Sequence, residues 1–133
     1  MTDVTELRLV VTAENYQEAL TFYRDVLGLG QLAEFDSPDG HVVLLDAGRA
    51  TLELTDPGNA AYVDQVEVGR RVAGPIRVAF QVADAAATTS RLTAAGAELI
   101  APPTVTPWQS RNARLTAPDG LQLTLFEELE DTP

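Results

Sequence analysis

Two arginines occupy matching positions in two similar segments of the chain. Arg8 is the second residue of LRLVV (7–11), and Arg77 is the second residue of IRVAF (76–80). Each segment alternates as a strand does and runs into a helix-like stretch. This repetition indicates a duplicated module with both arginines facing a shared cavity. Because a guanidinium presents a planar fork of donors, such a cavity could hold a carboxylate or another polar oxygen of a ligand.

The composition limits the chemistry that the protein can perform. The chain has 133 residues, 45% of them hydrophobic, a formal net charge of −11 and no cysteine, and all nine of its basic residues are arginine. These values predict one globular domain without thiolate chemistry, sulfur-ligated metals or a lysine Schiff base. The acidic balance disfavours nucleic acids and anionic membranes. With no signal-peptide pattern and no apolar run of roughly 18 residues, we expect a cytoplasmic protein.

The order of the predicted elements repeats once. In each half a strand leads into a capped helix, which Asn15 begins and Gly28 ends in the first half and Asp84 begins and Gly96 ends in the second. Three short strands follow each helix, so both halves are β-α-β-β-β units. The predicted strands are 7–12, 32–36, 42–45 and 51–55, then 76–82, 98–101, 112–116 and 121–126.

The boundaries follow from this repetition. We predict a single domain over 1–133 that consists of module one (5–56), a linker or lid (57–74), module two (75–128) and an acidic tail (129–133). The linker or lid is rich in polar and turn residues and carries a short helix around 62–68.

Period-two alternation separates two faces of the sheets. Apolar positions such as Leu9, Leu123 and Leu125 should pack against the helices, which leaves polar residues on the opposite face. A curled sheet with such a face would form a solvated groove for a ligand. The predicted ligand-binding residues are Arg8, Thr12, Thr51, Glu53, Thr55, Arg77, Gln81, Trp108, Gln122, Thr124 and Phe126.

Several of these segments resemble one known superfamily. They are residues 15–29 (NYQEALTFYRDVLGL), 50–54 (ATLEL), the second opening 76–82 followed by Asp84, and TPW with APDG near the end. Together they resemble the vicinal-oxygen-chelate superfamily, which includes glyoxalase I, bleomycin-resistance proteins and extradiol dioxygenases. The resemblance covers nearly the whole chain. It implies an α+β fold of two β-α-β-β-β modules, whose curled mixed sheets surround a ligand cavity, usually in a homodimer.

The resemblance also implies where a metal would bind. Enzymatic relatives usually have histidine at the positions matching Arg8 and Arg77, and carboxylates at those matching Glu53 and Thr124; only Glu53 fits. An arginine cannot ligate a divalent cation and repels it, by roughly 3 kcal/mol per unit charge at about 5 Å and an effective dielectric of about 20. We therefore predict neither a metal nor another cofactor.

Several residues have two interpretations. Arg8, Glu53 and Arg77 form a structural ion-pair network, bind a ligand, or do both. Trp108 either stacks on a ligand or packs within the fold. His41 lies at a predicted hairpin without a nucleophile or orienting acid in the sequence, so we interpret it as a surface or groove-rim residue.

Three hypotheses for function remain. We favour a metal-independent small-molecule-binding protein of the glyoxalase/bleomycin-resistance type, which sequesters an antibiotic or another organic metabolite in an aromatic-lined polar groove. The alternative is a metal-independent enzyme, such as an isomerase or lyase, with Glu53 as general base and an arginine that stabilises developing negative charge. In the third hypothesis the chain is an interaction subunit that uses the fold as a scaffold.

Overall fold

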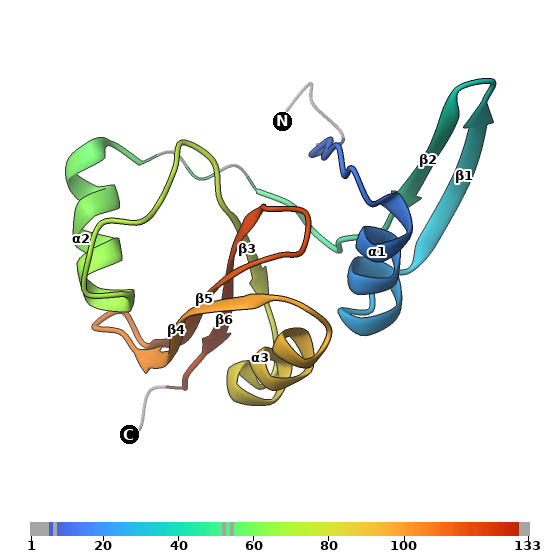
Figure 1. The fold of residues 1–133 in the computed structure, drawn as a ribbon. Coiled ribbons are helices and arrows are strands. Elements are labelled where there is room, and N and C mark those ends of the chain that lie inside the picture. The colour runs from blue at the N-terminus through green and yellow to red at the C-terminus, as the bar shows by residue number, and fades with distance from the viewer. Residues whose placement is uncertain (1–5, 7, 52, 54, 131–133) are drawn as a thin grey trace. The chain divides into compact units, whose positions relative to one another are not determined.

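The computed structural model describes residues 6, 8–51, 53 and 55–130 of the chain. The chain divides into two compact units, Met1–Leu54 and Thr55–Pro133. Each unit combines helical segments with its own sheet (Figure 1). This arrangement confirms the predicted α+β class. Among the described residues, no helix is long and apolar enough to cross a membrane.

The helix of the first unit begins where the sequence predicts. The Asn15 side chain accepts a hydrogen bond from the Glu18 amide at 3.1 Å and donates to the Glu18 carboxylate at 3.1 Å. The bond from the Glu18 amide caps the start of α1 (Tyr16–Leu20), which continues as the π-helix η1 (Thr21–Val26). Gly28 follows with φ 94°, a left-handed conformation that suits glycine at a helix end.

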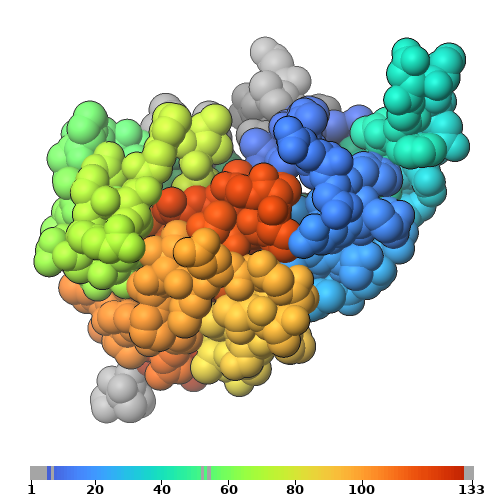
Figure 2. Space-filling model, in the orientation of Figure 1, coloured from blue at the N-terminus to red at the C-terminus, as the bar shows by residue number. Residues whose placement is uncertain are grey.

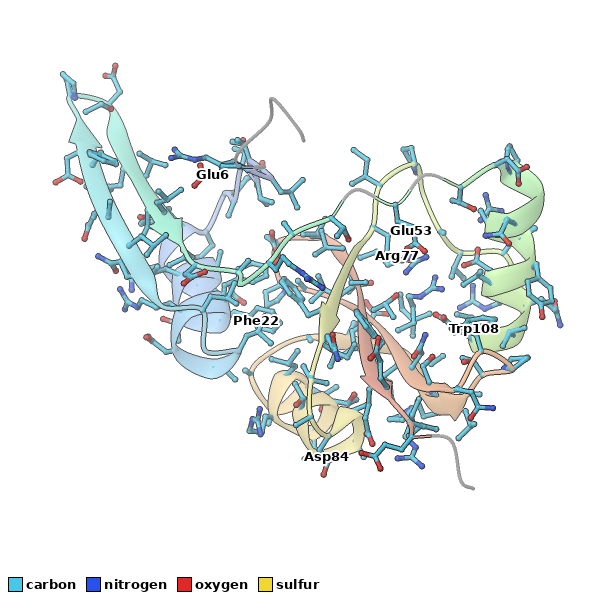
Figure 3. The ribbon with its side chains drawn as sticks, turned by 180° about the vertical axis from the view of Figure 1, so that it is seen from behind. Glu6, Phe22, Glu53, Arg77, Asp84 and Trp108 are labelled. Atoms are coloured by element: carbon cyan, nitrogen blue, oxygen red, sulfur yellow. The ribbon has the colours of Figure 1, made fainter. Side chains whose placement is uncertain are left out.

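Phe22 forms the apolar centre of this helix. Its side chain, labelled in Figure 3, is buried. It contacts the Tyr23 ring edge-on, with the ring centroids 5.0 Å apart. Leu20 and Ala19 are also buried. These three side chains form the buried apolar part of the first helix.

A hairpin completes the described secondary structure of the first unit. β1 (Gln31–Ser37) pairs in antiparallel register with β2 (Gly40–Leu45). In the turn, the Ser37 hydroxyl accepts a hydrogen bond from the Asp39 amide at 3.3 Å. Both predicted strands form here, because the turn residues allow the chain to reverse.

The first and last strands predicted for this half do not form in the described residues. Residues 8–12 and residues 51, 53 and 55 have no strand conformation, since β1 and β2 pair only with each other. Val10 is 85% exposed, and Leu9 and Val11 are exposed as well instead of packing on the helix. The strand prediction is wrong at these residues. A strand requires a neighbouring strand to pair with its backbone N–H and C=O groups, and an alternating pattern does not show whether one is present. Residues 7, 52 and 54 lie outside the described part of the chain.

The second unit forms four strands at the positions where the sequence predicts them. Its strand order is β3-β6-β5-β4, with β3 parallel to β6 and the other neighbours antiparallel. The strands are β3 (Val78–Gln81), β4 (Glu98–Val105), β5 (Ser110–Thr116) and β6 (Gln122–Glu128).

β4 extends past the predicted end at residue 101 and includes Pro102 and Pro103. β4 is an edge strand, and its pairing with β5 is irregular between Ala101 and Thr104. Proline is tolerated at such a place because its missing N–H interrupts no central ladder.

Helix α3 (Ala85–Ala94) covers the apolar face of this sheet. Asp84 caps it by accepting a hydrogen bond from the Ala87 amide at 3.0 Å (Figure 3). The helix packs on β4, β5 and β6. The fully buried side chains of this layer are Ala85, Leu92, Ala113, Leu115, Leu123 and Leu125. The prediction that Leu123 and Leu125 face the helix side is confirmed.

Helix α2 (Pro57–Glu67) lies on the opposite face and contacts β5. It begins earlier than the predicted 62–68. The Asp56 side chain accepts a hydrogen bond from the Asn59 amide at 2.9 Å, and Pro57 takes the first helical position. In the space-filling view, α2 and the loop after it (green to yellow-green) lie directly against the orange strands (Figure 2). The polar face expected to be solvated is therefore buried beneath α2 at β5.

His41, the only histidine of the chain, forms a contact that a pH titration can test. His41 and Asp36 are cross-strand partners, and Nδ1 of His41 lies 2.6 Å from Oδ1 of Asp36. This exposed contact raises the pKa of His41 above its ordinary 6.5. We expect Asp36→Asn to lower this pKa, as measured by an NMR pH titration of the single imidazole.

Because the pKa of His41 is raised in the folded state, the stability that its contact with Asp36 contributes depends on pH. The contact stabilises the fold below the ordinary histidine pKa, and its contribution is lost as pH rises through the folded-state pKa. Asp39→Asn, which makes the same chemical change in the neighbouring turn, serves as the control. An equal decrease in both variants would contradict a specific contact with Asp36.

Candidate functional site

Four of the predicted ligand-binding residues lie in the first unit. Arg8, Thr12, Thr51 and Glu53 are all exposed to solvent. The guanidinium of Arg8 forms an ion pair with the carboxylate of Glu6, two residues earlier. Arg77 belongs to the second unit, so the predicted Arg8–Glu53–Arg77 network stays a prediction.

In the second unit, the structure brings Arg77 and Thr124 together. Nη1 of Arg77 donates a hydrogen bond to Oγ1 of Thr124 at 2.6 Å. The parallel pairing of β3 with β6 sets Ala79 opposite Thr124, so Arg77 reaches the polar face just before β3 begins. Figure 3 shows Arg77 beside that strand. Two of the four positions that the resemblance equates with metal ligands are therefore neighbours.

This pair does not suit a divalent cation. A guanidinium carries only donors and a positive charge, and a threonine hydroxyl is a weak ligand compared with a carboxylate or imidazole. Within the described part of the chain, no group of three or more histidine, cysteine, aspartate or glutamate side chains could hold a metal ion. The arrangement can instead present a fixed positive charge and hydrogen-bond donors.

A buried charge cluster, which the sequence analysis did not identify, lies between α2 and the sheet. Nη1 of Arg114 on β5 donates to Oδ1 of Asp64 at 2.8 Å, and Nη2 donates to Oε1 of Glu67 at 2.8 Å. Nδ2 of Asn112 donates to Oε2 of Glu67 at 2.8 Å. Arg114 is 0% exposed, Asp64 1% and Glu67 4%. The cluster is thus a buried contact in which one arginine pairs with two carboxylates.

Asp64 also organises the loop after α2. Its Oδ2 accepts hydrogen bonds from Nη1 of Arg71 at 2.8 Å, the Val72 amide at 2.8 Å and the Ala73 amide at 2.9 Å. Burial by itself raises the pKa of Asp64, but the hydrogen bonds from Ala73, Arg114, Val72 and Arg71 outweigh it and hold the pKa well below the ordinary 3.8. Asp64 therefore stays ionised at neutral pH.

Gln122, a predicted site residue, belongs to this cluster. Its Oε1 accepts from Nη1 of Arg114 at 2.9 Å, and its Nε2 donates to the Val72 carbonyl at 3.1 Å. Thr55 has a local role instead, because its hydroxyl accepts from Nδ2 of Asn59 at 2.9 Å at the start of α2. Gln81 is exposed and Phe126 is half-buried.

Trp108 lies in the turn between β4 and β5. Its ring contacts that of Tyr62 on α2, with the centroids 6.2 Å apart at an interplanar angle of 52°. Trp108 is 42% exposed and Tyr62 53% exposed, so each ring keeps surface that is open to solvent. The next residue, Gln109, has φ 64°, a left-handed conformation that is uncommon for a residue with a side chain. The turn thus holds Trp108 against α2 while leaving part of it accessible.

The sequence contained only a weak signal for the buried cluster. Asp64 and Glu67 are three residues apart and so share one face of a helix, while Asn112 and Arg114 alternate on one face of a strand. Each pattern is typical of a solvated surface when it is read alone. Their association depends on a pairing between distant segments that no local pattern indicates.

Comparisons with known proteins agree with this architecture. The family profile described as the Glyoxalase/Bleomycin resistance protein/Dioxygenase superfamily matches residues 7–125. A search of curated proteins finds no match. Three solved structures illustrate the similarity.

The first of these structures is TnmS3, an antibiotic binding protein from Streptomyces sp. CB03234, at 22% identity and TM-score 0.63 over 96% of this chain and 99% of that one. A superfamily member from Sphaerobacter thermophilus DSM 20745 is 27% identical, with TM-score 0.57 and coverage of 90% and 92%. A protein of unknown function from Agrobacterium tumefaciens str. C58 is 25% identical, with TM-score 0.59 and coverage of 96% and 98%.

The buried cluster predicts a large effect of Asp64→Asn. Removing one partner of a buried ion pair leaves uncompensated charge, so we expect the free energy of unfolding to fall by roughly 3 kcal/mol or more. Urea denaturation at neutral pH measures this loss. Asp39→Asn, the same change in an exposed turn, should alter stability by no more than about 0.5 kcal/mol.

The free energy of unfolding measured at several pH values separates the contribution of the Asp64 charge from that of the size of its side chain. Because the folded-state pKa is depressed, the contribution of Asp64 is present above its ordinary pKa of 3.8 and is lost as pH falls through the folded-state value. The stability difference between the parent and Asp64→Asn should therefore shrink on acidification below about pH 4. A difference that stays constant down to acid unfolding would contradict this role.

Proposed function

The chain belongs to the glyoxalase/bleomycin resistance protein/dioxygenase superfamily, and from this premise we propose that it is a metal-independent small-molecule-binding protein. The observation that carries the proposal is the Arg77–Thr124 hydrogen bond at 2.6 Å. It fixes a guanidinium on the polar face of the second sheet, at positions where enzymatic relatives are expected to hold metal ligands. A fixed guanidinium suits an anionic or strongly polar oxygen of a ligand.

Two partly exposed aromatic rings support an organic ligand. Tyr62 and Trp108 contact each other and keep accessible surface, and such rings stack on planar groups. The similarity to TnmS3, described as an antibiotic binding protein, supports the same class of ligand. We propose that the ligand is a planar or amphipathic organic molecule, such as an antibiotic or another metabolite.

The enzymatic alternative gains no specific support. Glu53, the residue considered as its general base, is exposed in the first unit. A homodimer in the cytoplasm, and binding that involves Arg8, Thr12 and Thr51, stay predictions.

Ligand binding is tested with planar aromatic acids, beginning with 2-naphthoate. Isothermal titration calorimetry should detect binding, and the ligand should raise the melting temperature of the protein by mass action. Trp108→Ala should weaken binding by about 1 to 3 kcal/mol, because a desolvated aromatic contact is lost. Trp108→Phe keeps a ring at this position and should retain most of the affinity.

The same titrations test the role of Arg77. Arg77→Ala should weaken binding of 2-naphthoate more than that of the neutral 2-naphthamide, since only the acid gains from the guanidinium. Arg91→Ala removes an equal charge from an exposed position on α3 and should have little effect. If both naphthalene ligands bind the Trp108→Ala and Arg77→Ala variants as tightly as the parent, these residues have only structural roles.

Metal independence is tested by elemental analysis. We expect the purified protein to contain no stoichiometric divalent metal and ligand binding to be insensitive to a chelator, because Arg77 and Thr124 supply no adequate ligand. About one zinc, iron, manganese or nickel per chain would overturn the proposal. As a positive control, the combined change Arg77→His and Thr124→Glu should create measurable metal affinity, because these two positions are neighbours.

A further inference from the structure

The side chains that helix α2 buries completely are charged and not apolar. Its buried residues are Asp64 and Glu67, whereas α3 buries Ala85 and Leu92 together with two threonines. An apolar contact favours association in proportion to the area removed from water. A buried ion pair is different, because its attraction is offset by the cost of removing both charges from water. The docked and undocked positions of α2 are therefore closer in free energy than an apolar contact would make them.

Two atoms beneath α2 lack hydrogen-bond partners in the docked position. Nε of Arg114 and Oδ1 of Asn112 are buried and have no partner among the residues that the structure describes. Both side chains use their other polar atoms to hold Asp64 and Glu67. Buried groups of this kind are normally satisfied, and an unsatisfied one is destabilising. Undocking α2 would open both atoms to water or to a ligand.

We propose that α2 is a movable cover over a carboxylate-binding surface formed by Arg114 and Asn112, and that Asp64 and Glu67 occupy this surface until a ligand carboxylate replaces them. The inference rests on the proposed function, since it assigns the ligand class and a gating element to the same polar face. Arg114 follows the alternation of β5 and pairs in register with Thr124 of β6, the residue that holds Arg77. Thr124 thus has Arg114 as its cross-strand partner on β5 and accepts a hydrogen bond from the Arg77 guanidinium.

The unsatisfied atoms define the chemistry of the ligand. Nε and Nη2 lie on one edge of a guanidinium, which is the edge that binds a carboxylate through two parallel hydrogen bonds. Nη2 of Arg114 now donates to Glu67 alone, while Nε is unused. A ligand carboxylate would satisfy both, and Oδ1 of Asn112 would accept from a neighbouring N–H or O–H of the ligand. The surface therefore favours an organic acid that carries a hydrogen-bond donor.

If α2 is a cover, the apparent affinity for a ligand carboxylate depends on the fraction of molecules in which α2 is undocked. When only a fraction of molecules can bind, the apparent affinity is reduced by that fraction. Glu67→Gln removes one charge but keeps the size of the side chain, so it should weaken docking and raise the apparent affinity for 2-naphthoate by about three- to tenfold. Glu98→Gln is the matched control because it makes the same charge change at an exposed position of the same unit. It should leave the affinity unchanged.

Hydrogen exchange reports the movement of α2 independently. An undocked helix of 11 residues is only marginally stable by itself, so its amides should exchange faster than those of β5 and β6 in the parent. Glu67→Gln should increase exchange in α2 by a similar three- to tenfold, to about the extent of the affinity gain, while β5 and β6 stay protected. Saturating 2-naphthoate should hold α2 undocked and further increase its exchange.

The outcomes separate this inference from the proposed function. One outcome is that the parent binds 2-naphthoate through Trp108 and Arg77, but Glu67→Gln changes neither the affinity nor the exchange of α2. The proposal that α2 is a movable cover is then wrong, while the proposed binding function stands. An equal affinity gain in Glu98→Gln would show a general charge effect and also overturn the cover. Loss of protection throughout β5 and β6 in Glu67→Gln would mean that α2 is an inseparable part of the unit. If neither naphthalene ligand binds the parent or any variant, both proposals are contradicted.

Discussion

The burial of the Arg114 guanidinium is the constraint on which the position of α2 and of the loop after it depends. A charged group with no exposure requires compensation from its surroundings, because leaving it unpaired away from water is very costly. Asp64 and Glu67 provide that compensation only if α2 lies over β5 in one register. Asp64 then also fixes the turn from α2 toward β3 through Arg71 and two backbone amides. One arginine thus determines the position of a helix and of the loop that follows it.

The two faces of this sheet contribute to the fold in different ways. On the α3 side, leucines such as Leu115 and Leu123 are completely removed from water, which supplies non-directional stability. On the α2 side the contacts are directional hydrogen bonds with defined partners. A polar interface of this kind contributes little net stability but selects one arrangement over others. The chain therefore combines a conventional core with a face suited to recognition.

Local sequence patterns predicted the elements of the second unit well because local causes determine them. Asp84 caps α3 whatever its distant neighbours are, and alternation around Leu123 and Leu125 identifies the apolar face. The same alternation was misleading at residues 8–12, because it describes which side chains could share a face and not whether a neighbouring strand exists. For the candidate site, Arg77 and Thr124 were both predicted. Arg114 was not, since its buried state depends on acids that lie about fifty residues away.

The parallel pairing of β3 with β6 has a consequence for how the second unit folds. β3 is the first strand of this unit and β6 the last, yet they are direct neighbours in the sheet. Helix α3 and the β4–β5 hairpin can form from local contacts, but β3 gains its hydrogen-bonded neighbour only when residues 122–128 are available. Closing such a long loop slows folding and leaves strand edges exposed in the meantime. Until β6 joins, β3 is unpaired on both sides, and the newly made chain is exposed to aggregation during that interval.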